Sequence, residues 1–184
     1  MDDSGAMQST PVKAPRWPKG LGAFGILVAV LMFFDHLGDL GPLSWSRQDW
    51  IRHVPELAER PELVDLVMQA MNPAWIVPVS LLGMALAGLL LAGSVNLRQQ
   101  RHRGVVQCRV WSWLAIAFMV FEGGRRLFWL TGHFEEVWAI ESSGNPWWEY
   151  IVVAVVLALL AYPVFLLVYL SRPSIRNQYA GWPA

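Results

Sequence analysis

The chain has 184 residues, of which 55% are hydrophobic and only 15% are charged. A water-soluble domain carries about 25% charged residues, so this composition indicates an integral membrane protein. The 14 basic residues balance the 14 acidic ones, which argues against a nucleic-acid-binding protein. The single cysteine excludes an intrachain disulfide framework and a cysteine-based zinc site.

Uncharged runs locate the membrane-spanning helices, because about 20 helical residues cross the roughly 30 Å hydrocarbon core. Residues 73–97 and 150–171 are long enough by themselves, whereas residues 21–34 and 110–121 must continue through charged residues. The alternative is two spans with additional buried or re-entrant helices. We expect an all-α, four-helix transmembrane domain over residues 20–171, with spans at about 20–40, 73–97, 106–130 and 147–171.

The distribution of charge predicts how these helices thread the membrane. Nine of the 14 basic residues lie in the segments 1–20, 98–109 and 172–184, where the only acids are Asp2 and Asp3. Cytoplasmic segments are enriched in Lys and Arg. We therefore expect tails at 1–19 and 172–184, both termini in the cytoplasm, and a bacterial inner membrane as the location.

The segments 41–72 and 131–146 are external loops in this topology. The first of them predicts two short amphipathic helices on the outer surface. Ser46 with Asp49 resembles a capping box at a helix start, and the apolar residues within 63–71 follow helical spacing. These helices either cap the bundle or form a docking surface.

Small residues predict close helix packing. Gly83 with Ala87, and Gly88 with Ala92, repeat at four-residue spacing, which lets helices approach one another in lipid. Packing within the bundle is the default, and oligomerisation is the alternative. Residues 20–25 fit the pattern G-x-G-x-x-G, but no strand precedes them, so we do not expect a dinucleotide site.

Tryptophans predict where the membrane surfaces lie. Indole rings favour the headgroup layer. We therefore expect Trp17, Trp111 and Trp113 to anchor the helices at the inner surface.

A layer of charged residues is predicted in the outer third of the membrane. Asp35 lies about 22 Å from the inner end of its span, and Glu122 lies about 20 Å from Arg109. Glu122 can pair with Arg125 or Arg126 on the same helix, which leaves the other arginine for Asp35. The layer is either an ion-paired clamp or a pocket for an anionic group, a quinone-like ligand or a proton.

Two histidines, His36 and His133, lie at the outer ends of the first and third spans and could ligate haem or copper from two helices. A lone histidine at a helix end is more often solvated or hydrogen-bonded, and no H-x-x-x-H or C-x-x-C-H motif is present. The sequence also lacks a nucleophile motif and a Gly-rich phosphate loop. It therefore favours a protein that is not an enzyme and identifies no particular cofactor.

Three hypotheses for function remain. The first is a non-catalytic integral membrane subunit or scaffold of a larger membrane complex. The second is a small homo-oligomeric transporter or channel component that uses the charged layer. The third is a haem- or quinone-binding redox module. All three place the chain in a lipid bilayer, with protein partners or further copies of itself and without nucleic acid.

Overall fold

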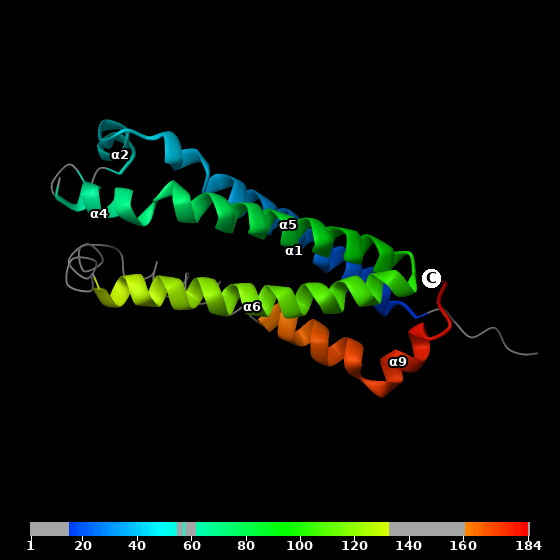
Figure 1. The fold of residues 1–184 in the computed structure, drawn as a ribbon. Coiled ribbons are helices and arrows are strands. Elements are labelled where there is room, and N and C mark those ends of the chain that lie inside the picture. Colours follow the sequence, from blue (N-terminus) through cyan, green and yellow to red (C-terminus); the bar gives the residue numbers. More distant parts are fainter. Residues whose placement is uncertain (1–14, 55–56, 58–61, 133–160, 184) are drawn as a thin grey trace, which may run out of the picture.

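The computed structural model describes residues 15–54, 57, 62–132 and 161–183, and each regular element within them is a helix (Figure 1). The long helices are α1 (Trp17–Gly38), α5 (Pro73–Arg98) and α6 (His102–Gly132). The shorter ones are the 3-10 helix η1 (Gly41–Ser44), α2 (Arg47–His53), α4 (Glu62–Ala70), a helix at Ala161–Ser171, and α9 (Pro173–Tyr179).

Three segments are long and apolar enough to cross a membrane: Trp17–Ser44, Pro73–Arg98 and His102–Arg125. α1 and α6 continue through Asp35 and Glu122 without interruption, so the two short apolar runs extend as the predicted spans require. Of the fourth predicted span, residues 161–171 form an apolar helix, and residues 147–160 lie outside the described residues. The chain is therefore an all-α membrane protein with three candidate spans in its described part.

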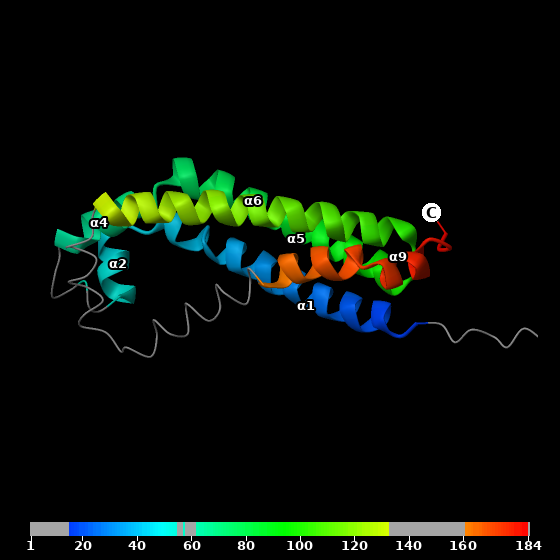
Figure 2. The same cartoon turned by 90° about the horizontal axis from the view of Figure 1, so that it is seen from below.

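α5 packs along α1 on one side and along α6 on the other (Figures 1 and 2). Two glycines of α1 allow the first contact. A β-carbon on Gly22 would lie 2.6 Å from the backbone oxygen of Ser94, and one on Gly25 would overlap the Ser94 hydroxyl. These glycines belong to the G-x-G-x-x-G-like run, so in this fold the run serves helix packing.

The apolar core includes the helix at Ala161–Ser171. Leu166 and Leu170 of this helix are fully buried and belong to one cluster with Trp111 of α6. Trp111 is only 1% exposed, so it is a core residue, and the expectation that it anchors the helix at the interface is wrong. Trp113 is 65% exposed and points away from the bundle.

Helices α2 and α4 occupy the two stretches where the Ser46–Asp49 capping box and the apolar spacing within 63–71 predict short helices. The Ser46 hydroxyl accepts a hydrogen bond from the Asp49 N–H at 3.3 Å, and the Ser46 N–H donates to the Asp49 carboxylate at 2.9 Å, which completes a capping box. Hydrogen bonds from the Ser46 hydroxyl and backbone hold the pKa of Asp49 below its ordinary value of 3.8. Trp50, Leu63 and Val64 form a separate small core between these helices.

The C-terminal residues fold back onto the opposite end of the bundle. The His102 N–H donates to the Pro183 carbonyl oxygen at 2.9 Å, which joins the C-terminus to the start of α6. Trp17 at the start of α1 stacks on Trp182 with 5.6 Å between ring centroids, and its Nε1–H donates to Gln178 Oε1 at 2.7 Å. Residues 172–183, expected as a tail, therefore pack on the bundle.

Candidate functional site

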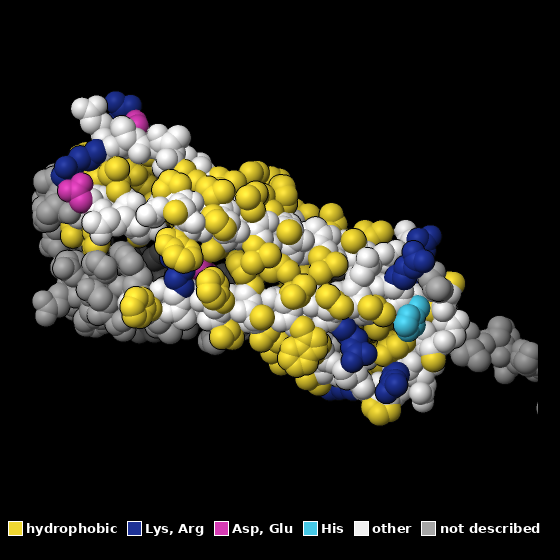
Figure 3. Space-filling model, viewed as in Figure 1, with side chains coloured by type: hydrophobic (Ala, Val, Ile, Leu, Met, Phe, Trp, Pro, Cys, Tyr) yellow, Lys and Arg dark blue, Asp and Glu magenta, His cyan; other side chains and the backbone are white. Residues whose placement is uncertain are grey.

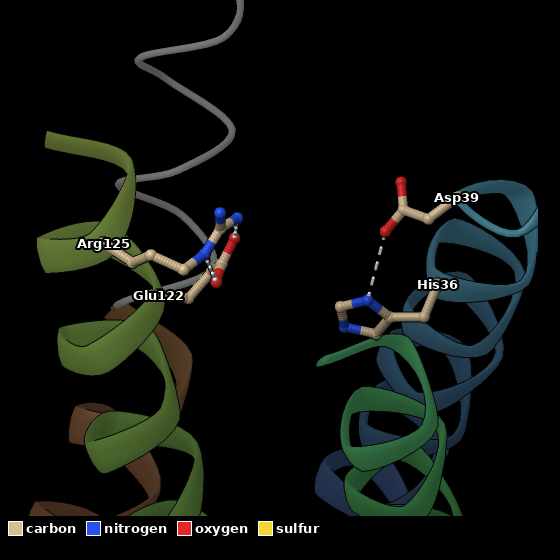
Figure 4. A network of polar contacts seen from close by, with 4 residues as sticks. All are labelled: His36, Asp39, Glu122 and Arg125. Carbon is tan, nitrogen blue, oxygen red and sulfur yellow. Dashed lines mark hydrogen bonds and ion pairs between the residues drawn. The ribbon is translucent and has the colours of Figure 1, made fainter. Parts of the chain in front are cut away.

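Glu122 and Arg125, two residues of the predicted charged layer, are in direct contact on α6 (Figure 4). Arg125 Nε donates to Glu122 Oε2 at 2.8 Å, and Arg125 Nη2 donates to Glu122 Oε1 at 2.6 Å. The three-residue spacing brings both side chains to one face of the helix. Because both carboxylate oxygens are engaged, the guanidinium is held in a fixed plane as well as attracted by charge.

This pair is mostly hidden from solvent, because Glu122 is only 8% exposed. Opposite charges in contact neutralise each other, which is the condition under which ionised side chains are tolerated inside a membrane. A guanidinium has five N–H donors, so three of those of Arg125 remain beyond the two that contact Glu122. The arrangement is therefore chemically able to act as a clamp within α6 or to hold an anionic group.

Asp35 is exposed on α1. Within the described part of the chain, no hydrogen bond or ion pair joins its side chain to another residue. Arg125 is engaged by Glu122, and the side chain of Arg126 lies outside the described residues. The structure thus brings Glu122 and Arg125 together and does not bring Asp35 to Arg125.

His36 interacts with Asp39, one turn further along α1 (Figure 4). Their nearest atoms, Nδ1 and Oδ2, are 3.5 Å apart. At this distance the imidazole and the Asp39 carboxylate form an ion pair when the imidazole is protonated, but the distance is long for a hydrogen bond. Asp39 is not among the residues that the sequence indicates as partners of His36, although its i, i+3 spacing is a signal for this contact.

The His36 ring is inserted between the three long helices. It lies directly over Gly83 of α5, where a β-carbon would overlap ring atoms Cδ2 and Nε2. Its other neighbour is Phe118 of α6, which it meets edge to face with 5.8 Å between ring centroids. Gly83 therefore provides the space for this ring, and His36 acts as a packing residue in the contact between helices.

This packing does not fit an axial ligand to haem. A coordinating Nε2 needs a metal atom about 2 Å away, and here that edge of the His36 ring lies against Gly83. The second candidate ligand, His133, lies outside the described residues. Among the residues that the structure describes, no group of three or more His, Cys, Asp or Glu side chains could hold a metal ion.

Two further polar atoms in the helix contacts were not anticipated. Ser80 of α5 is completely buried, and its Oγ makes no hydrogen bond within the described part of the chain. Nε1 in the indole of Trp111 is also buried, and it too makes no hydrogen bond within the described part of the chain. A single serine and a single tryptophan within apolar runs give no sequence signal that their polar atoms are buried, because this burial depends on how each helix is rotated about its axis.

Comparisons of this chain with family models, with curated proteins and with solved structures found no match.

Proposed function

We propose that this protein is a non-catalytic integral membrane subunit that holds a partner helix against α1. The observation that carries the proposal is a row of exposed side chains on α1, here called the α1 stripe: Leu27, Leu31, Phe34 and Asp35. The three apolar members are 54%, 61% and 64% exposed, and Asp35 is exposed as well. Spacings of three and four residues place all of them on one side of the helix.

Asp35 is the member of the α1 stripe that indicates a protein partner. Lipid covers exposed leucines as well as a protein does, so the apolar members alone do not require one. Asp35 lies 16 residues after Lys19, which is about 24 Å along the helix. A carboxylate at that depth is costly unless a cation pairs with it, and no described residue supplies that cation.

The partner expected from this chemistry is a membrane helix with apolar residues and one Lys or Arg at the level of Asp35. Its cation would neutralise the carboxylate, and its apolar face would cover Leu31 and Phe34. Buried charge pairs that are fully matched also discriminate against other helices, because a wrong partner leaves an unpaired charge.

Native mass spectrometry of the protein released gently from its own membrane tests this proposal. The wild-type mass should exceed a multiple of 20.7 kDa by the mass of a second kind of chain. Asp35→Asn should lose that chain, whereas the control Asp39→Asn, one turn away and beside His36, should keep it. A wild-type protein without any other chain, or equal loss from both variants, would contradict the proposal.

A second candidate function is favoured by the depth of the Glu122–Arg125 pair. Charged pairs within the membrane often mark ion or substrate pathways, so a small homo-oligomeric transporter or channel component is the alternative. In the same measurement, a homo-oligomer without other chains, unaffected by Asp35→Asn, would support this alternative over the subunit.

We also propose that both termini face the cytoplasm of a bacterial inner membrane. Basic side chains gather at the end of the bundle where α5 meets α6 and where α9 packs (Figure 3), and cytoplasmic segments are enriched in Lys and Arg. A fluorescent protein fused after Ala184 should fluoresce, and alkaline phosphatase fused there should be inactive. The reverse pattern would place this end outside.

A further inference from the structure

A groove opens at the basic end of the bundle, between the start of α1 and the end of α5. It is lined by Lys19, Ile26, Val95, Arg98 and Gln99. Lys19 is in the first turn of α1, and Arg98 is the last residue of α5, so two cations from different helices meet at one site. In the part of the chain that the structure describes, neither makes an ion pair.

The lining of the groove changes from polar to apolar with depth. Ile26 follows Lys19 by seven residues, which places it on the same face about 10 Å deeper along α1. Val95 lies one turn deeper than Arg98 on α5 and is 38% exposed. The groove therefore presents two positive charges and an amide at the membrane surface and two aliphatic side chains below them.

The position of Arg98 is determined by the helix contact itself. Its Cγ lies directly over Gly22 of α1, where a β-carbon would overlap it. The first part of the Arg98 side chain thus packs against α1, while the residue stays exposed and lines the groove. A side chain held in this way loses less conformational entropy on binding a ligand than a freely rotating arginine does.

We propose that this groove binds the phosphate headgroup of an anionic phospholipid from the adjoining leaflet, with an acyl chain lying along Ile26 and Val95. A guanidinium and an ammonium together match a phosphate group, and basic pockets between membrane helices bind such headgroups. A soluble anion would use only the charged half of the groove. The aliphatic half matches a ligand that continues into the hydrocarbon layer.

Native mass spectrometry with added lipids tests this proposal in the full-length protein. Wild type should retain phosphatidylglycerol in preference to phosphatidylcholine. Lys19→Gln with Arg98→Gln should weaken phosphatidylglycerol binding by about 25-fold, from a loss of about fivefold for each cation. Gln keeps a γ-carbon, so the contact of residue 98 with Gly22 is retained. The matched control, Arg103→Gln with Arg109→Gln, removes two exposed cations of α6 at the same end and should leave the preference intact.

A second pair of variants separates the groove from general attraction to the basic end. Val95→Trp should fill the aliphatic half and reduce phosphatidylglycerol binding with all charges present. Leu91→Trp, at a residue that is 40% exposed and outside the lining, should not. Equal weakening by both charge variants, no preference for phosphatidylglycerol in wild type, or full competition by millimolar inorganic phosphate would overturn the proposal.

Discussion

Glu122 lies 13 residues beyond Arg109 on α6, about 20 Å along the helix, and there Arg125 supplies its counter-charge. The same helix carries both groups, so the ion pair forms whenever the helix forms and needs no second element to position it. Two charge-assisted hydrogen bonds satisfy both carboxylate oxygens. The pair can therefore exist at this depth as a neutral unit.

Glu122→Gln should lower the stability of the folded protein if this pair is a clamp. The change leaves the Arg125 guanidinium, whose side chain is 24% exposed, without its carboxylate, and breaking such a buried pair costs about 3–5 kcal/mol. The thermal midpoint and the yield from membranes should both fall. The double variant Glu122→Gln, Arg125→Gln should recover most of this loss, because the Arg125 guanidinium is removed together with its carboxylate.

Arg109→Gln, an exposed arginine on the same helix, is the control and should change neither quantity. If Glu122→Gln is as stable as wild type and loses a transport or binding activity, the pair is a ligand site. If stability and activity are both unchanged, Arg125 reaches the outer headgroups and the pair has neither role.

At the level of the helices, the sequence predicts well those features that depend on residues close together in the chain. The uncharged runs predict the long helices, and Ser46 with Asp49 predicts one helix start. Asn72 before Pro73 is a local signal of the same kind, because it is the pattern of an N-cap followed by proline at the first helical position. In the structure, Asn72 Oδ1 accepts from the Ala74 N–H at 2.9 Å, and Ser46 caps α2. Each of these signals involves residues within one turn of each other, so no knowledge of the tertiary fold is needed.

What the sequence does not predict is the rotation of each helix about its axis. α1, α5 and α6 carry apolar residues on all sides, because lipid and protein neighbours are equally apolar, so no stripe distinguishes the inner face. The sequence places Trp111 at the interface because indole rings favour the headgroup layer, but the rotation of α6 buries this residue. The sequence predicts that Gly83 packs against another helix, but not that it receives His36. Gly88 is a further example. The sequence predicts close helix packing at this residue, but a β-carbon built on Gly88 would lie in open space.

The sequence predicts the candidate site only where the contacts are local, as it does for the helices. The pairing of Glu122 with Arg125 follows from their spacing on one helix, which is local information. The exposure of Asp35 and the insertion of His36 against α5 depend on how helices far apart in sequence meet. These features become visible only when α1 is placed beside α5 (Figure 2).

For the molecule as a whole, the end that carries the groove is closed by contacts among distant parts of the chain. Trp17 stacks on Trp182, meets Tyr169 edge to face at 5.5 Å between centroids, and is hydrogen-bonded to Gln178. One indole thus links the start of α1 to the last described helices. This link holds the start of α1 against the last described residues, and it makes residues 172–183 part of the folded unit.

Trp17→Ala should therefore loosen the whole basic end of the bundle. Loss of the ring contacts and of one hydrogen bond should reduce the free energy of unfolding by about 1–3 kcal/mol. Trypsin should then cleave faster after Arg176, because α9 is released from the bundle. Trp113→Ala removes an indole that is 65% exposed and should change neither the thermal midpoint in detergent nor the cleavage rate. If the two variants behave alike, the C-terminal residues are held by α6 alone, through the contact of His102 with Pro183.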